Sequence, residues 1–183
     1  MRPLAIALVL VWTALTAGAQ QRFGPAENLA PYIPTPEILV QRMLEAARVK
    51  AGDVVYDLGS GDGRIVIMAA QKFNAKSVGI EIRPDLCRRA EDRVKALGLE
   101  DRVRIIQDSA LRVDLSPATV VTMYLLTDSN ERMRPSLEKY LKPGARVVSN
   151  DYPIRGWRAA EMLVVRTGSA EHRIFVYEVG HTR

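Results

Sequence analysis

The stretch Val-Val-Tyr-Asp-Leu-Gly-Ser-Gly-Asp-Gly-Arg at residues 54–64 decides the fold of this chain. An apolar run ends in the carboxylate of Asp57, and residues 65–70 are again apolar with no helix-breaking residue. Between them glycines stand at alternate positions, Gly59, Gly61 and Gly63. The pattern predicts a strand, a tight turn and a helix that packs back against the strand. A structural turn needs only one glycine, so three together indicate a ligand that lies against the backbone.

The spacing and charge of this turn indicate which ligand it holds. A dinucleotide-binding turn reads Gly-x-Gly-x-x-Gly and places pyrophosphate on the helix N-terminus. Here the spacing is Gly-x-Gly-x-Gly, and an acid two residues before the first glycine would repel phosphate. An acid suits a ligand with a cationic end, such as S-adenosylmethionine, which carries an α-ammonium beside a sulfonium. The loop resembles the first motif of the class I S-adenosylmethionine-dependent methyltransferases. The resemblance implies cofactor contacts from Asp57, Leu58, Gly59, Ser60, Gly61, Asp62 and Gly63.

Two further acids stand where such a site would need them. Residues 77–81 form a short apolar run that ends in Glu81, 24 residues after Asp57, which is one strand–helix–strand unit further along. A carboxylate at this strand end can accept hydrogen bonds from both ribose hydroxyls. Residues 103–109 repeat the pattern with Asp108, and in the methyltransferase family an acid there binds the adenine amino group. The resemblance adds the neighbours Ile82 and Ser109 to the expected cofactor site.

The composition of the chain limits its expected size class, partners and catalytic groups. The chain has 183 residues with 48% hydrophobic and 26% charged content, which is sufficient for one globular domain with a core. The net charge is +5, but the basic residues are scattered and no basic run with interleaved aromatics occurs, so nucleic acid is not an expected partner. No metal-ligand spacing occurs. His172 and His181 fall in a terminal hairpin and a tail, so they are poor general-base candidates, and no catalytic base is assigned.

Residues 1–19 predict a secretory signal peptide. A positive residue, Arg2, precedes an apolar run over residues 3–15, and Ala17-Gly18-Ala19 is a small-x-small cleavage site. An uncleaved N-terminal anchor is the alternative, and it would be the only contact with a membrane. In both cases the domain is expected outside the cytoplasm. Export conflicts with a cofactor that is made in the cytosol, and nothing in the sequence explains how the cofactor would be supplied.

The rest of the chain predicts an N-terminal arm and one domain. Residues 20–34 lack periodicity and contain three prolines, which indicates an arm laid on the domain. Over residues 35–180 strands alternate with helices, with a fourth strand at 119–126 and a final hairpin of 160–165 and 172–179. This order predicts an α/β fold with a doubly wound, mostly parallel sheet. The class I methyltransferases share it, with seven strands and a C-terminal antiparallel hairpin.

A narrower resemblance concerns the acceptor. The chain is similar to the small mitochondrial lysine methyltransferases that act on ATP synthase subunit c and on the adenine nucleotide translocase, and to their bacterial relatives. The segments that carry the likeness are 31–35, 57–66, 79–81, 144–149 and a Pro-x-x-x-Trp element at 153–157. The resemblance implies a protein lysine as acceptor. Aromatic and proline residues expected around the acceptor pocket are Tyr32, Pro34, Tyr124, Tyr152 and Trp157.

The end of the fourth strand leaves other acceptors open. Enzymes that methylate planar amide or nucleobase nitrogens place Asn/Asp-Pro-Pro-Tyr/Phe there, whereas residues 122–126 read Thr-Met-Tyr-Leu-Leu. The sequence therefore argues against DNA adenine or glutamine as acceptor. A lipid or small-molecule methyltransferase is one alternative. A non-catalytic exported domain that keeps the fold and binds a nucleoside is another.

Overall fold

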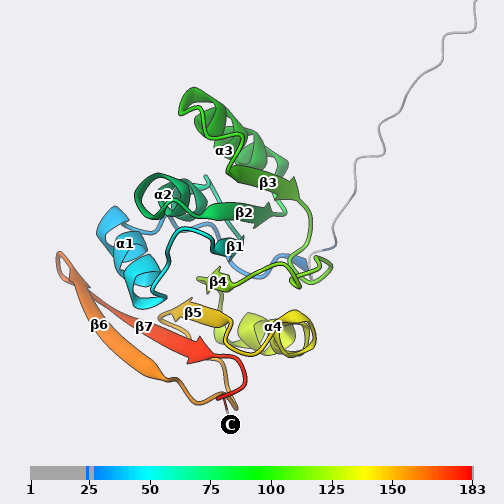
Figure 1. Cartoon of the computed structure of the whole chain (residues 1–183). Helices are drawn as coiled ribbons and strands as arrows, with labels where there is room; N and C mark the ends of the chain where they lie inside the picture. Colours follow the sequence, from blue (N-terminus) through cyan, green and yellow to red (C-terminus); the bar gives the residue numbers. More distant parts are fainter. Residues whose placement is uncertain (1–23, 25–26, 183) are drawn as a thin grey trace, which may run out of the picture.

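A seven-stranded sheet organises the residues that the computed structural model describes, which are Gly24 and residues 27–182 (Figure 1). Its strands are β1 (Val54–Leu58), β2 (Lys76–Glu81), β3 (Val103–Gln107), β4 (Val120–Met123), β5 (Arg146–Asn150), β6 (Glu161–Thr167) and β7 (Ala170–Glu178). Their order in the sheet is β3-β2-β1-β4-β5-β7-β6. The first five strands pair in parallel, and β7 pairs antiparallel with both β5 and β6. The predicted α/β sheet and its antiparallel hairpin are confirmed, whereas the predicted signal peptide lies outside the described residues.

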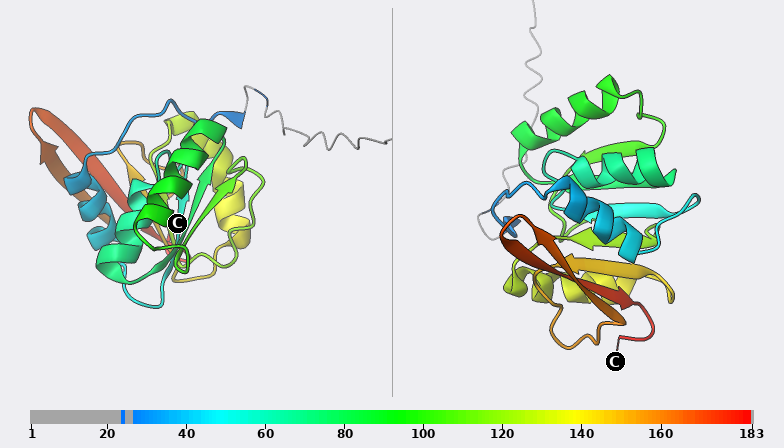
Figure 2. Two further views of the ribbon diagram at one scale, coloured as in Figure 1. Left: turned by 90° about the horizontal axis from the view of Figure 1, so that it is seen from above. Right: turned by 90° about the vertical axis from the view of Figure 1, so that its left-hand side faces the viewer.

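Helices cover both faces of the sheet (Figure 2). The helices α1 (Glu37–Ala46), α2 (Arg64–Phe73) and α3 (Pro84–Ala96) lie on one face, and α4 (Thr127–Tyr140) lies on the other. Right-handed crossovers explain this arrangement, because the strand order runs outward from β1 in one direction to β3 and in the other direction through β4 to β5. In such sheets the ligand crevice lies at the carboxyl ends of the strands where the order reverses. Here that point is between β1 and β4.

The central strands are buried on both faces, which explains their unbroken apolar sequences. Every residue of β4 is buried. Val120 belongs to the core under α1 and α2, whereas Val121 and Met123 belong to the core under α4. Successive side chains of a strand point to opposite faces, so a single short strand contributes to both cores. The strand ends at Met123, although the apolar run that predicted it continues to residue 126.

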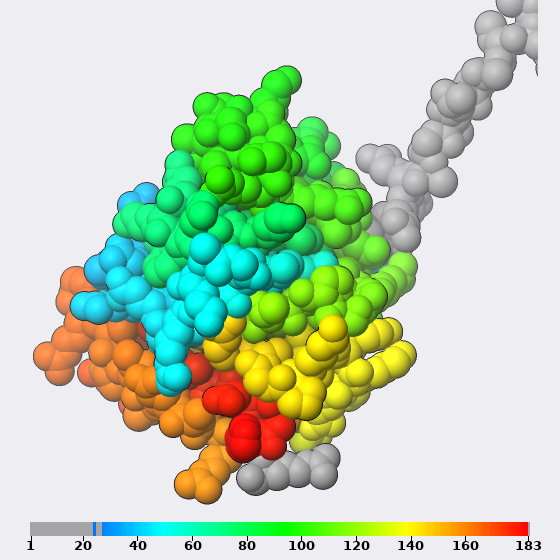
Figure 3. Space-filling model, viewed as in Figure 1, coloured from blue at the N-terminus to red at the C-terminus, as the bar shows by residue number. Residues whose placement is uncertain are grey.

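The N-terminal arm crosses the carboxyl ends of the strands (blue in Figure 2). Leu29 is buried in the core under α4, and the Ser129 hydroxyl donates a hydrogen bond to the Leu29 carbonyl. Glu27 forms an ion pair with Arg112 at 2.7 Å. The arm is therefore part of the folded domain over residues 27–34. In the space-filling view α3 and the β6–β7 hairpin lie at opposite ends of the molecule (Figure 3). Within the described residues no helix has the length and apolar character needed to cross a bilayer.

Candidate active site

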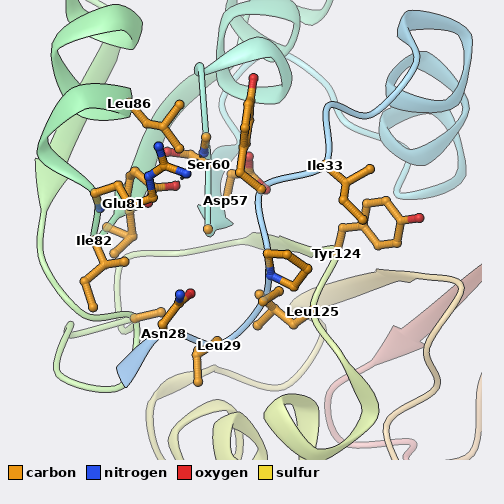
Figure 4. Close-up of a pocket in the computed structure, with 18 of the residues that line it drawn as sticks. Asn28, Leu29, Ile33, Asp57, Ser60, Glu81, Ile82, Leu86, Tyr124 and Leu125 are labelled. Carbon is orange, nitrogen blue, oxygen red and sulfur yellow. Dashed lines mark hydrogen bonds between the residues drawn. The ribbon is translucent and has the colours of Figure 1, made fainter. Parts of the chain in front are cut away.

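A pocket opens at the carboxyl ends of the strands, at the point where the strand order reverses (Figure 4). The glycine loop after β1 forms its base, the end of β2 forms one wall, and the arm crosses its mouth. Most of the residues predicted from the sequence line it: Asp57, Gly59, Ser60, Gly61, Asp62, Glu81, Ile82 and Asp108 from the expected cofactor site, and Tyr32, Pro34, Tyr124 and Tyr152 from the expected acceptor pocket. In Figure 4, Glu81 and Ile82 lie on one side of the arm and Tyr124 lies on the other.

The glycine loop and Glu81 hold each other in place. The N–H of Gly59 donates to the carbonyl of Ile80 at 2.9 Å. The N–H of Gly61 donates to Oε2 of Glu81 at 2.8 Å, and the N–H of Arg83 donates to Oε1 at 2.9 Å. Each carboxylate oxygen thus accepts one backbone hydrogen bond and keeps further acceptor capacity. Two free acceptor positions on one buried carboxylate match the two neighbouring hydroxyls of a ribose.

Asp57 is a buried acid in the wall of the pocket. Its side chain is only 3% exposed and accepts a hydrogen bond from the Thr122 hydroxyl at 2.7 Å. Burial raises the pKa of Asp57 to about 7, the Thr122 hydrogen bond opposes this rise, and the charges of Glu81 and Asp62 add to it. A cation placed beside Asp57 would reverse the shift. The α-ammonium and the sulfonium of S-adenosylmethionine supply that charge, so this end of the pocket fits the predicted cofactor.

Asp108 and the apolar wall next to Glu81 suit a flat purine ring. Asp108 lines the pocket, and its Oδ1 accepts the N–H of Ser109 at 2.6 Å, so the carboxylate keeps further acceptor capacity on its second oxygen. Ile82 and Leu86 lie beside Glu81 (Figure 4). The cofactor fits this pocket at three places, because a cation, a diol and an amino-substituted ring each meet a suitable group.

Asp62 lies in the pocket wall, but arginines already neutralise its carboxylate. Arg64 and Arg93 each approach Oδ2 of Asp62 at 2.8 Å. Burial alone would raise the pKa of Asp62, but the hydrogen bond from Arg64 and the two positive charges hold it below its ordinary value. Arg64 also donates to the Thr35 carbonyl at 2.7 Å. Asp62 and its two arginines therefore connect the glycine loop, α3 and the end of the arm.

Tyr32 fastens the arm to the glycine loop. Gly61 has a φ of 55°, and a Cβ added there would lie 2.6 Å from the Tyr32 ring. A side chain at this position would be strained and would displace the ring. Gly61 is therefore required both for the turn and for the contact with the arm.

Three residues of the expected cofactor site lie outside the pocket wall. Leu58 is buried in the core under α4. Gly63 precedes α2 with a φ of 77°, and a Cβ there would lie 3.1 Å from that of Ala90, so this glycine allows close packing of α2 on α3. Ser109 is fully buried behind Asp108. Their sequence positions are adjacent to pocket residues, but their side chains or Cα atoms face the core.

Trp157 also differs from the prediction, because it packs in the core under α4 instead of lining the acceptor pocket. Its ring meets the edge of Tyr177 at a centroid distance of 5.7 Å and an angle of 66°. Its Nε1 donates to Glu138 of α4 at 3.0 Å. The chain turns at Gly156, which has a φ of 77°, and directs the indole under α4. The sequence places Trp157 near the fifth strand but does not show this turn.

Sequence reasoning missed several lining residues. The arm contributes more of the wall than Tyr32 and Pro34, and the glycine loop and α3 contribute additional side chains. They include Glu27, Asn28, Leu29 and Ile33 of the arm, Arg64 and Leu86 of α2 and α3, Ala110 after β3, and Leu125 and Leu126 after β4. The prolines identified the arm from the sequence, but an arm without periodicity gives no sign of which side chains turn inward.

The fold and the pocket together define a class I S-adenosylmethionine-dependent methyltransferase. The chain belongs to the family of the ANTKMT methyltransferase domain, whose family model matches residues 57–161. The prediction of the methyltransferase fold and activity is thereby confirmed. S-adenosylmethionine is the methyl donor, as the glycine loop and its acids predicted.

The relatives of this chain include enzymes with different named acceptors. A protein-lysine N-methyltransferase of Saccharolobus islandicus is 50% identical over 82% of this chain and 94% of the relative. The adenine nucleotide translocase lysine N-methyltransferase of Mus musculus is 28% identical over 95% of this chain and 73% of the relative. The crystal structure of an RNA methyltransferase from Salinibacter ruber in complex with S-adenosyl-L-homocysteine is also similar. Its sequence is 44% identical, its TM-score is 0.75, and the match covers 80% of this chain and 94% of that chain.

Replacing Glu81 by alanine is expected to weaken the binding of S-adenosylhomocysteine at least about tenfold. Each hydrogen bond to a charged acceptor contributes roughly 1.5–3 kcal/mol, and the variant loses the two that the ribose would make. Isothermal titration calorimetry measures the change. Glu91→Ala, which removes an exposed acid from α3, is the matched control and should bind like the wild type. Equal affinities for Glu81→Ala and the wild type would remove Glu81 from the cofactor site.

Proposed function

We propose that this chain methylates lysine side chains of proteins. The observation that carries the proposal is the pair Tyr124 and Tyr152, which lines the pocket at the ends of β4 and β5 with a ring-centroid distance of 6.2 Å. Tyr124 stands where enzymes acting on planar nitrogens carry an Asn/Asp-Pro-Pro-Tyr/Phe element. Aromatic walls are suited to an alkylammonium, which aromatic faces attract. The 50% identical relative named as a protein-lysine N-methyltransferase supports the same acceptor.

The residues of the chain bind and orient the reactants in this proposal. The cofactor supplies a methyl group on a sulfonium, and transfer to a neutral amine leaves a methylammonium on the acceptor and a neutral thioether on the donor. Glu81 holds the ribose, and Asp57 holds the cationic end of the cofactor. The aromatic rings and the arm exclude water from the acceptor, which lowers the pKa of a lysine amine and favours its neutral form. Proximity in a dry pocket then supplies most of the rate, without an assigned general base.

Labelling of cell extract tests the acceptor class. Extract from a host strain that lacks the gene is incubated with the enzyme and a methyl donor labelled in the methyl group. We expect the label in protein, resolved to lysine by mass spectrometry. Label in RNA would instead indicate the acceptor that the Salinibacter ruber structure names, and label confined to lipid or small molecules would contradict the proposal. A preparation of the Asp57→Asn variant serves as the inactive control.

We also propose that residues 1–19 direct export and are removed after Ala19. The support is the sequence of the leader, with Arg2, the apolar run and the small-x-small site. Mass spectrometry of the N-terminus of protein from the native host should find a chain that begins at Gln20. An intact Met1 in a soluble cytosolic fraction would contradict export.

A further inference from the structure

Three polar side chains from different strands meet beside the acceptor side of the pocket. Tyr124 follows β4, Asp151 follows β5, and His172 belongs to β7. The carboxylate of Asp151 lies close enough to the Tyr124 phenol to raise its pKa through hydrogen bonding and charge. Oδ2 of Asp151 lies 2.8 Å from Nδ1 of His172. Neither Asp151 nor His172 takes part in the cofactor site described above, so the cluster needs another explanation.

Asp151 is held in an unusual backbone conformation. Its φ is 59°, in the left-handed region that side chains other than glycine seldom adopt. Its N–H donates to the Arg173 carbonyl at 2.7 Å, and its Oδ1 accepts the Arg173 N–H at 2.9 Å. The end of β5 is thereby fixed against β7. Strained residues of this kind concentrate at functional sites, where the surrounding structure maintains them.

The cluster also fixes what Tyr124 presents to the pocket. The contact with Asp151 favours a phenol proton directed at the carboxylate, so the Tyr124 oxygen presents lone pairs to a ligand. Burial, the hydrogen bond and the charge of Asp151 raise the pKa of Tyr124 to about 12, so the phenol stays protonated at neutral pH. The rings of Tyr124 and Tyr152 both line the pocket. An N–H donor with positive charge therefore finds an acceptor oxygen, two aromatic rings and a nearby carboxylate.

We infer that Tyr124 and Asp151 form the subsite for the ammonium group of the acceptor, and that His172 is a positioning residue for Asp151. The inference rests on lysine as the acceptor. Lysine binds as the ammonium, loses one proton to solvent before its nitrogen attacks the methyl carbon, and leaves as methylammonium. A carboxylate therefore favours binding and also stabilises the charge that develops on nitrogen during transfer. Tyr124 accepts an N–H of the amine and orients the nitrogen. Asp151 keeps 23% of its side chain exposed, so its charge is not sealed in the core, and it precedes Tyr152 of the pocket wall in the chain.

The contacts of His172 define its role. Nδ1 lies against Asp151, and Nε2 lies 3.0 Å from the Thr167 hydroxyl, so both ring nitrogens are occupied. The side chain is only 14% exposed. His172 holds the carboxylate of Asp151 in one orientation, as the third group of a hydrogen-bonded series does in other enzymes.

Asp151→Asn tests the subsite. Asparagine also tolerates a left-handed backbone and can accept the Arg173 N–H, so the fold should be kept while the charge is lost. With poly-L-lysine and unmethylated host protein as acceptors, we expect kcat/KM to fall about 30-fold or more, as for other close charge pairs. The affinity for S-adenosylhomocysteine, measured by calorimetry, should stay within about twofold. The exposed Glu171→Gln, one residue from His172, is the matched control and should keep full activity.

His172 requires a pair of variants. His172→Val removes the hydrogen bond to Asp151 and is expected to lower kcat/KM about tenfold. His172→Asn places an N–H near the position of Nδ1 and should restore most of that loss, which a role in packing alone would not predict. Activity of Asp151→Asn near that of the wild type, or an equal loss of cofactor affinity, would overturn the subsite. A wild-type enzyme that labels lysine in neither acceptor would instead overturn the proposed function, and the subsite with it.

Discussion

Replacing Asp57 by asparagine is expected to abolish measurable cofactor binding and, at pH 8, to make the cofactor-free protein more stable. Asp57 is buried, and burial raises its pKa from 3.8 to about 7 in the folded protein. Between these values the unfolded chain binds fewer protons than the folded chain, so folding stability falls as the pH rises through this window. Three pH units correspond to ~4 kcal/mol at most. Asparagine cannot ionise, keeps an acceptor for Thr122, and avoids this loss.

Chemical denaturation at two pH values checks the stability effect. At pH 8 we expect the free energy of unfolding of Asp57→Asn to exceed that of the wild type by on the order of 1–3 kcal/mol. The gain stays below the upper limit because burying a polar amide also costs free energy. At pH 5 the wild-type carboxyl is mostly protonated, so the difference should shrink. If Asp57→Asn is less stable than the wild type at pH 8, the ionised Asp57 does not destabilise the cofactor-free protein, and the prediction is wrong.

Calorimetry checks the binding effect. The wild type must release the proton of Asp57 before it can hold a cation there, so its affinity for S-adenosylmethionine should rise up to about tenfold per pH unit below pH 7 and level off above it. Glu81 and Asp62 are the acids that also act on Asp57. The asparagine side chain of the variant Asp57→Asn cannot ionise, so the variant should bind S-adenosylmethionine too weakly to measure at any pH.

Deleting residues 20–34 is expected to abolish turnover while part of the cofactor affinity survives. The glycine loop, Glu81 and Asp57 lie outside the deletion, so the Gly61 N–H still donates to Glu81 and the Thr122 hydroxyl still donates to Asp57. The arm, however, supplies much of the pocket mouth, and Tyr32 rests on Gly61. Without it, water reaches the acceptor and the pocket loses the enclosed surroundings that favour a neutral amine. The prolines of the arm restrict the unfolded chain, so closing the mouth requires little ordering of the backbone.

Two measurements separate function from folding in the deletion. The arm contributes the buried Leu29, and removal of a core leucine typically destabilises a protein by about 2–5 kcal/mol, so thermal unfolding must be followed alongside activity. Tyr32→Ala leaves Leu29 in place and removes only the ring on Gly61, so it should lower turnover with a smaller effect on stability. Full turnover by a folded deletion protein would show that the arm does not close the site.

The sequence by itself determined the sheet, the cofactor and most of the cofactor pocket. Asp57, Gly59 and Gly61 are neighbours in the chain, and their chemistry is local, because a turn against a ligand demands glycine whatever surrounds it. Glu81 and Asp108 follow from the same logic, since the ends of parallel strands share one edge of a sheet. The alternation of apolar strands and amphipathic helices then predicted the doubly wound order. It did not show where β4 ends, because the apolar run continues into the pocket wall at Leu125.

The tertiary structure alone decided which distant groups meet. Nothing in the sequence indicated that Arg93 of α3 pairs with Asp62 in the pocket wall, or that the turn before Trp157 directs its ring into the core. Tyr124, Asp151 and His172 lie far apart in sequence and meet only because β7 inserts beside β5. The pKa of Asp57 likewise depends on burial by the whole domain. Charges and hydrogen bonds act through space over a few ångströms, and strand order and register, which a linear pattern does not encode locally, bring the partners within that range.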